Sequence, residues 1–315
     1  LGPWPRREQS VRIRNMDHSS PSGPVIVGID GSPASLRAAR WAAAEASSWG
    51  VPLHLAHAWS VPVVEWPVPG GPTYGDAGQF RAASQEVLQQ AATALRDELG
   101  SDGPELHLIS LEGQPAHQLI QTAIGARALV LGTRGQGGFA GLLLGSVVAA
   151  CLHHARTPVV AVGGNLVLPG AGSVVVGVDS SDGSRAALRW AAREAARHGV
   201  LLRVVHGWDS AAVTPPGPQA FGPLDGDDFA VAADRFLTEL VDEVLSDEGL
   251  ADAGPDVECL VVPAPAAEAL LWEARGAALL VVGTRGRGGF AGLLLGSVSR
   301  QCANHAPCPV AVVPR

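Results

Sequence analysis

Two glycine-rich segments have the residue types and spacing of a phosphate-binding loop. The first contains Gly132-Thr133-Arg134-Gly135, nine further residues, and Gly145-Ser146. The second repeats this pattern as Gly283-Thr284-Arg285-Gly286, nine residues, and Gly296-Ser297. Glycine permits positive φ angles and a close approach of the backbone, so that successive N–H groups can surround an anion. Both segments are therefore predicted to bind phosphate.

Glycine-rich turns also occur where nothing binds, so the context of the pattern has to decide between the two interpretations. Each segment follows a predicted strand and precedes a predicted helix. A helix N-terminus adds about half a positive charge at this point. The hydroxyls of Ser146 and Ser297 are placed where they can cap the helix or reach a phosphate oxygen. The repeated context favours binding.

The two loops belong to a duplicated unit. Residues 25–59 and 174–208 are identical at about half of their positions, and 128–147 matches 278–298, which gives a period of about 150 residues. A period of this length is a whole domain, and a Gly/Pro-rich stretch separates the copies. We expect a disordered leader at 1–24, a first domain at 25–163, a linker at 164–173 and a second domain at 174–315.

Strands and helices alternate along each copy, which predicts the α/β fold class. In the first copy the predicted strands are 25–29, 53–59, 105–111, 128–132 and 158–162, and the predicted helices are 35–49, 80–99, 116–125 and 146–154, with a loop at 60–78. This alternation requires right-handed crossovers and a parallel sheet with helices on both faces. Ligands of such sheets bind beyond the C-terminal ends of the strands.

Together these motifs resemble the ATP-binding branch of the universal stress protein family. The resemblance rests on the glycine loops, on Val-Gly-Ile-Asp-Gly-Ser at 27–32, and on His-Ala-x-x-Pro-Val before the last strand. It covers nearly the whole chain beyond residue 24. It implies two tandem Rossmann-like domains of the flavodoxin-like, adenine nucleotide α-hydrolase-like type. Each would have a five-stranded parallel sheet of order 3-2-1-4-5, with ATP across the strand ends.

The resemblance also implies which residues bind the nucleotide. In the first copy, the triphosphate would be held by Gly132, Gly135, Gly145 and Ser146, and the ribose and adenine would lie against Gly28 and Asp30. In the second copy the same roles fall to Gly283, Gly286, Gly296, Ser297, Gly177 and Asp179. Weaker candidates within the same loops are Thr133, Arg134, Val147, Thr284, Arg285 and Val298.

Asp30 and Asp179 allow more than one interpretation. An aspartate between a strand and a helix is often only an N-terminal cap. It can also bond a ribose hydroxyl, or hold Mg²⁺ through water, since Mg²⁺ prefers few carboxylates and several waters. No direct metal ligand is predicted.

Three functions are compatible with this pattern. The leading one is an ATP-binding protein of stress response or signalling, whose nucleotide stabilises one conformation or assembly. The second is a slow ATPase or phosphotransferase; against it, the chain lacks lysine and any GKS/T pattern, which leaves Arg134 and Arg285 as cations. The third is a pairing module that binds no nucleotide and joins domains through the closing strands, 158–162 and 309–313. The family suggests an intrachain pseudo-dimer of the two domains and a further homodimer.

Composition excludes several classes of partner. The net charge of −8 argues against nucleic acid, and no apolar stretch reaches the roughly 18 residues of a membrane span.

Four cysteines are too few for a disulfide framework, which favours the cytoplasm. Abundant Ala, Gly and Arg without lysine suggest a bacterial protein from a GC-rich genome. Met16, the only methionine, is a candidate translation start.

Some conspicuous residues are expected to be structural. Cys302, His305 and Cys308 have a metal-like spacing, but the matching residues of the first copy are Cys151, His154 and Thr157, which breaks the ligand set. We expect His57 and His206 to be structural, and Trp41 and Trp190 to be core residues. The loop residues Leu142–Leu144 and Leu293–Leu295 need an apolar partner surface, either at the nucleotide or at the other domain.

Overall fold

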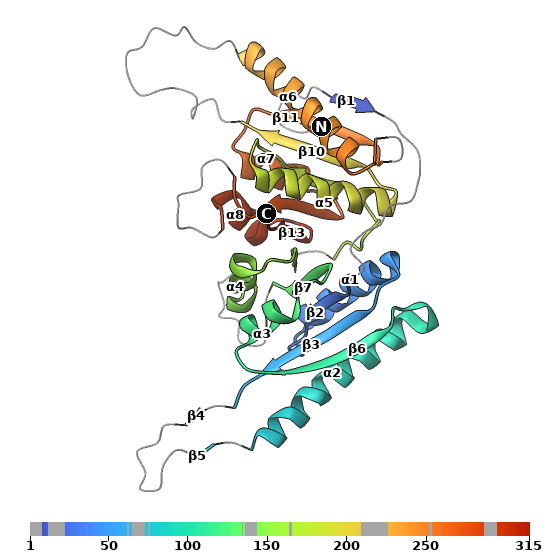
Figure 1. Cartoon of the computed structure of the whole chain (residues 1–315), viewed down its shortest axis with the longest axis vertical. Helices are drawn as coiled ribbons and strands as arrows, with labels where there is room; N and C mark the ends of the chain where they lie inside the picture. The colour runs from blue at the N-terminus through green and yellow to red at the C-terminus, as the bar shows by residue number, and fades with distance from the viewer. Residues whose placement is uncertain are drawn as a thin grey trace. The chain divides into compact units, whose positions relative to one another are not determined.

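The computed structural model divides into two compact domains between Gly163 and Gly164 (Figure 1). The structure describes residues 8–11, 23–61, 63–64, 73–74, 76–133, 135, 144–163, 166–208, 226–251, 254–286 and 295–315. The first domain ends at Gly163, and the second contains Gly164–Arg315 together with an N-terminal strand.

The first domain is built on a parallel sheet with the order β6-β3-β2-β7-β8. Its strands are β2 (Val25–Gly28), β3 (Leu53–Trp59), β6 (Leu106–Glu112), β7 (Ala128–Gly132) and β8 (Val159–Val162). Its helices are α1 (Pro33–Trp49), α2 (Ala77–Leu99), η1 (Gly100–Asp102), α3 (Pro115–Thr122) and α4 (Ser146–His154). Counted along the chain, this is the predicted order 3-2-1-4-5, which is confirmed. The segment predicted as a loop at 60–78 contains a short antiparallel ladder of β4 (Val63–Val64) and β5 (Thr73–Tyr74).

The second domain repeats this architecture, with the parallel order β11-β10-β9-β12-β13. Its strands are β9 (Val174–Gly177), β10 (Leu202–Gly207), β11 (Val257–Val262), β12 (Leu279–Gly283) and β13 (Val310–Val313). Its helices are α5 (Asp182–His198), α6 (Gly226–Asp247), α7 (Ala266–Glu273) and α8 (Ser297–His305). The α/β class and the tandem arrangement predicted from the sequence are therefore confirmed.

The second domain has one strand that the sequence did not predict. β1 (Glu8–Val11) pairs antiparallel with β11, so that Gln9 lies opposite Cys259 and Val11 opposite Val257. We expected residues 1–24 to be a disordered leader, and this expectation is wrong for Glu8–Val11. An unpaired sheet edge offers backbone N–H and C=O groups, and β1 satisfies those of β11.

Helices cover both faces of each sheet, and the first helix packs on it through small residues. In α1 the alanines Ala38, Ala39, Ala42, Ala43 and Ala46 are fully buried, which lets the helix pack close to the sheet. α1 packs beside α2, and α3 beside α4; α5 with α6 and α7 with α8 repeat this arrangement (Figure 1). The central strands β2 and β7 are buried along almost their whole length, as expected for a doubly covered parallel sheet. None of the described helices is long and apolar enough to cross a membrane.

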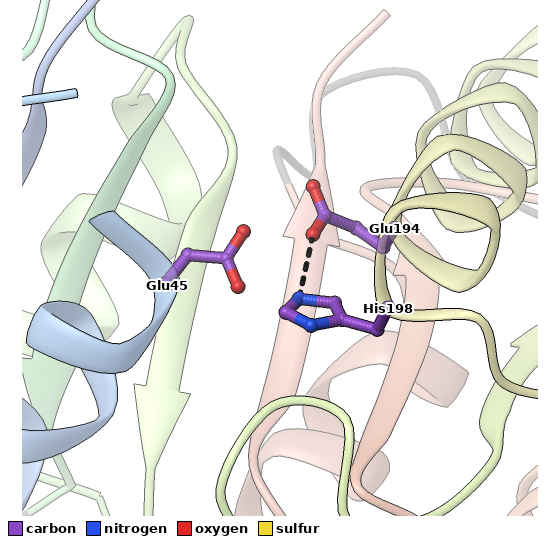
Figure 2. Close-up of side chains that lie close together, drawn as sticks. All are labelled: Glu45, Glu194 and His198. Carbon is purple, nitrogen blue, oxygen red and sulfur yellow. Dashed lines mark ion pairs between the residues drawn. The ribbon is translucent and has the colours of Figure 1, made fainter. Parts of the chain in front are cut away.

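Each domain buries a glutamate near the end of its first helix. Glu194 is 1% exposed, and its Oε2 lies 3.8 Å from Nε2 of His198, one turn later on α5 (Figure 2). In the first domain the matching residues are Glu45 and Trp49, and the indole N–H of Trp49 donates to Glu45 at 2.7 Å. A buried carboxylate needs such partners, because burial without them is costly.

Candidate functional site

The second domain has a cavity of about 540 Å³ at the C-terminal ends of its central strands. Gly177 at the end of β9, Gly207 at the end of β10 and Gly283 at the end of β12 line it from the sheet. Ala266 and Leu270 of α7 and the first turn of α8 close its sides. This is the edge at which parallel α/β sheets bind their ligands, and the volume is that of a small-molecule site.

The cavity brings together most of the residues predicted for the second copy. The predicted residues that line it are Gly177, Asp179, Gly283, Arg285, Gly286, Gly296, Ser297 and Val298. Thr284, also predicted, is not among the lining residues. The lining residues that sequence reasoning missed are Val178, Ser184, Val205, Gly207, Ala266, Leu270, Val282 and Ser299. Most of these are apolar, and the sequence alone does not distinguish them from core residues of the strands and helices.

Leu295 also lines the cavity and is 7% exposed. It belongs to the leucine triplet for which the sequence left two partners open, the nucleotide site or the other domain. Leu295 lies at the cavity where the nucleotide was expected. Arg134 and the loop residues Leu142, Leu143, Leu293 and Leu294 lie outside the described residues.

Glycine is required in the loop because other chain segments come very close. A Cβ atom at Gly283 would lie 2.6 Å from the carbonyl oxygen of Gly183, in the first turn of α5. At Gly286 a Cβ would collide with Oδ2 of Asp179. The first domain repeats both approaches, at Gly132 against Ala34 and at Gly135 against Asp30. The conserved spacing of the loop therefore places the strand end, the helix start and an aspartate side by side in each domain.

The aspartate is not the cap of the following helix. Ser181 caps α5, since its Oγ accepts from the N–H of Ser184 at 3.2 Å. Asp179 instead accepts through Oδ1 from the N–H of Ser181 at 2.9 Å and from its hydroxyl at 2.5 Å. In the first domain Ser32 caps α1, and its N–H donates to Oδ1 of Asp30 at 3.0 Å. The cap interpretation of the two aspartates is therefore wrong, and these bonds fix each carboxylate beside the glycine loop.

The amide groups of the loop are only partly available to an anion. The N–H of Gly296 donates to the carbonyl oxygen of Thr284 at 2.7 Å, and the N–H of Gly145 donates to Thr133 at 2.8 Å. These two amides are engaged within the protein in this structure, whereas the sequence predicted that Gly145 and Gly296 hold the triphosphate. Both residues are the N-terminal caps of the following helices, α4 and α8.

The first turn of α8 provides the remaining donors. Gly296 is the N-terminal cap without a side-chain bond, and the helical ladder begins with the N–H of Arg300 donating to Gly296. The N–H groups of Ser297, Val298 and Ser299 precede that ladder, so they have no acceptor within the helix. Ser297 is the first helical residue and not the cap. Ser146 has the same position in α4.

The electrostatics of the cavity favour an anion at one end. The N-terminus of α8 contributes positive potential, and Arg285 lines the same region. In the part of the lining that the structure describes, Asp179 is the carboxylate, and there is no histidine or cysteine. At the other end the cavity is apolar, with Val178, Val205 and Leu270. An elongated ligand with an anionic end and a flat apolar end would match this arrangement.

Comparison with known proteins identifies the family. The model of the universal stress protein family matches residues 22–163 and again 171–314. The chain belongs to this family. A universal stress protein of Mycolicibacterium smegmatis is 35% identical over 303 residues, which are 92% of this chain and 96% of that protein. One from Mycobacterium tuberculosis is 34% identical over 306 residues, 94% of this chain and 98% of that protein.

A solved universal stress protein has the same fold. The crystal structure of the protein from Archaeoglobus fulgidus covers 93% of this chain and 99% of its own, with a TM-score of 0.67 at 20% identity. The tandem Rossmann-like architecture is therefore shared well beyond close relatives. At this identity the likeness concerns the fold, and the site has to be argued from the residues of this chain.

The cysteines of this universal stress protein have no role at the cavity. All four are free and buried, and burial raises the pKa of each thiol to about 12. Such thiols stay protonated at neutral pH, whereas the thiolate is the metal ligand and the nucleophile.

The two strand-end histidines are held in different ways. Nδ1 of His206 lies 2.9 Å from the carbonyl oxygen of Val178, which can only accept, so the proton is on Nδ1. Nδ1 of His57 instead lies 2.8 Å from the hydroxyl of Ser84. Burial lowers the pKa of His57, and the charge of Asp30 opposes this shift. Trp41 is 1% exposed, as expected for a core residue.

Proposed function

We propose that this universal stress protein binds ATP in its glycine-lined sites and acts in stress response or signalling through that binding. The observation that carries the proposal is the cavity of the second domain, where a glycine loop, a helix N-terminus and Asp179 meet at the strand ends. The phosphates would lie against the first turn of α8 and Arg285. The base would lie among Val178, Val205 and Leu270.

Asp179 fits a role at the ribose. Its Oδ1 is held by Ser181, and its Oδ2 points toward Gly286, between the apolar and the anionic end of the cavity. A carboxylate placed there accepts from a ribose hydroxyl, or holds Mg²⁺ through water. Asp30 is held in the same way by Ser32 in the first domain. We therefore propose one nucleotide per domain.

Binding, and not turnover, is the activity that this site supports. Phosphoryl transfer requires a residue that orients or deprotonates the nucleophile. Among the described residues that line the cavity, Asp179 is the only carboxylate, and it belongs to the ribose end of the proposed pose. Nucleotide occupancy then acts by stabilising the state that binds it.

Two measurements test the proposal. Freshly purified protein is denatured and the released small molecules are identified by mass spectrometry; stripped protein is then titrated with ATP by calorimetry. Gly286→Ala should weaken binding to the second domain by about tenfold or more, since the new Cβ displaces the carboxylate of Asp179, and tenfold corresponds to about 1.4 kcal/mol.

Matched controls separate binding from folding. Gly103→Ala, also a glycine-to-alanine change, lies at the end of α2 beside Leu99 and should leave ATP affinity unchanged. Ser297→Ala should weaken binding, whereas Ser246→Ala, at an exposed position of α6, should not. Protein that releases no nucleotide and shows no ATP affinity would overturn the proposal and favour the pairing module.

A further inference from the structure

Two histidines of the first domain lie directly opposite each other on neighbouring strands. His54 of β3 pairs in register with His107 of the outer strand β6. Their ring centroids are 5.0 Å apart and their planes are inclined by 62°. Glu105 precedes His107 by two residues, and its Oε1 lies 3.1 Å from Nε2 of His107. Two imidazoles and a carboxylate therefore gather on one patch of the sheet edge.

The second domain has an ion pair at the equivalent positions of its sheet. Arg203 of β10 lies opposite Glu258 of β11 in the equivalent register, and Arg203 Nε lies 2.6 Å from Oε2 of Glu258. Opposite charges on facing residues stabilise a strand pair. The first domain replaces this ion pair by two side chains of the same kind, which gain no such attraction and would repel each other when both are protonated. A shared cation would supply the attraction that the pair lacks.

We propose that His54, His107 and Glu105 form a binding site for a divalent transition-metal ion of the Zn²⁺ and Cu²⁺ class. Imidazole nitrogen suits these ions, and a carboxylate oxygen is a common third ligand. Three protein ligands leave a further coordination position open to water or to a ligand from outside. Hard cations such as Mg²⁺ prefer oxygen ligands and are not expected to bind here.

Two of the three ligands are already at the spacing that an ion requires, and the third has to change its rotamer. Two ligand atoms on a tetrahedral ion with bonds of about 2.0–2.2 Å lie about 3.3 Å apart, close to the distance between Glu105 and His107. The His107 and Glu105 side chains are 46% and 73% exposed, so they can rotate and an ion can enter from solvent. His54 and His107 occupy paired positions with their ring centroids 5.0 Å apart, and the half-buried His54 would have to change its rotamer to join the other two ligands.

The simpler alternative is an edge-to-face contact of two imidazoles with no ion. The two interpretations predict different numbers of bound metal ions. They also predict different effects when His54 and His107 are replaced by the arginine and glutamate that the second domain has at these positions. The double substitution His54→Arg with His107→Glu introduces the ion pair that the second domain already uses in the same register. This variant should therefore fold, and it removes both imidazoles. His153→Ala with His154→Ala is the matched control, because it removes another neighbouring pair, on α4.

The test is a titration of the full, nucleotide-free chain with Zn²⁺ by calorimetry, with Cu²⁺ paramagnetic resonance to count bound nitrogens. We expect one tight ion per chain with two imidazole nitrogens. His54→Ala, His107→Ala and the Arg/Glu exchange should each weaken binding by at least about tenfold, since loss even of outer partners costs 10–100-fold. The α4 control should bind as the wild type does.

Three outcomes would overturn the proposal: no Zn²⁺ binding by the wild type, unchanged binding by the Arg/Glu exchange variant, or loss of binding in the α4 control alone. Circular dichroism of each metal-free variant checks that the fold is retained. ATP affinity should be the same in all variants, so this test is independent of the nucleotide site.

Discussion

At the scale of single residues, the glycine at the end of the fourth parallel strand of the first domain is tightly constrained by the backbone of a neighbouring helix. A Cβ at Gly132 would lie 2.6 Å from both the carbonyl carbon and the carbonyl oxygen of Ala34, and 2.9 Å from the amide nitrogen of Ser35. These are backbone atoms in the first turn of α1, so they cannot turn away as a side chain can. Either α1 or β7 has to move to admit a methyl group.

We therefore predict that Gly132→Ala lowers the free energy of unfolding by about 1–3 kcal/mol, the usual cost of overpacking. Urea denaturation followed by circular dichroism measures it. Gly103→Ala is the control, because Gly103 has an ordinary φ of −71° and its nearest neighbour would be the Leu99 side chain at 3.3 Å. It should change stability by no more than about 0.5 kcal/mol. Equal losses in both variants would contradict the packing argument.

Other residue-scale features could not be read from the sequence. The glycine spacing predicted the loops, because only glycine tolerates such close backbone contacts. Whether Asp30 or Ser32 caps α1 depends on backbone angles two residues apart, and both residue types are good caps. The bond from the N–H of Gly145 to Thr133 is likewise decided by how the loop folds back on itself, which no spacing rule specifies.

At the scale of elements, a chain of hydrogen bonds joins β3, α2 and β6 in the first domain. The indole N–H of Trp59 donates to Ser110 at 2.9 Å, Ser110 and Ser84 lie 2.8 Å apart, and Ser84 lies 2.8 Å from Nδ1 of His57. Trp59 can only donate, so Ser110 accepts from it. Each hydroxyl has two acceptor lone pairs, so the direction of the other two bonds follows the tautomer of His57.

The second domain shows that an apolar version of this layer also folds. Val261 lies opposite His206 where Ser110 lies opposite His57. The buried positions of α2 and α6 follow the same spacing, which places Ala233 where the fully buried Ser84 lies. The two hydroxyls are thus a feature of the first domain alone, and they should be energetically coupled.

We predict that Ser84→Ala costs about 1–3 kcal/mol, because it removes the partner of Nδ1 of His57 and one of the two partners of Ser110, which keeps its bond from Trp59. The double variant Ser84→Ala with Ser110→Val should cost less than the sum of the two single changes, by about 0.5–3 kcal/mol. A double-mutant cycle in urea measures this coupling. Strictly additive losses would show that the hydroxyls act independently.

Element prediction from the sequence succeeded where periodicity was strong and failed where a strand depends on its partner. The predicted strands of the first copy agree with the structure to within one residue at either end. β1, with the sequence Glu-Gln-Ser-Val, has no alternating pattern, and it is a strand because the edge of β11 is available to it. Tertiary partners of this kind are invisible to a local pattern.

At the scale of the whole molecule, duplication gives each domain its own nucleotide site under our proposal. A ligand that binds only the folded state stabilises it by RT ln(1 + [L]/Kd), about 4 kcal/mol at a thousandfold excess over Kd. Because Gly135 faces Asp30 as Gly286 faces Asp179, the two sites can be disabled one at a time by the same kind of change. Stability then reports on occupancy domain by domain.

We predict that saturating ATP raises the unfolding midpoint of both domains in the wild type, with two nucleotides bound per chain. Gly286→Ala should reduce the stoichiometry to one and leave only the first domain stabilised; Gly135→Ala should do the reverse. In each variant the loss of ATP affinity comes from the displaced aspartate carboxylate and not from a lost backbone bond. The free energy of unfolding without ATP should therefore change far less than it does in Gly132→Ala. Thermal unfolding with and without ATP measures the stabilisation of each domain, and calorimetry measures the number of nucleotides bound per chain. If either single substitution abolished stabilisation of both domains, the sites could not be the independent units that the repeated geometry of Asp30 and Asp179 implies.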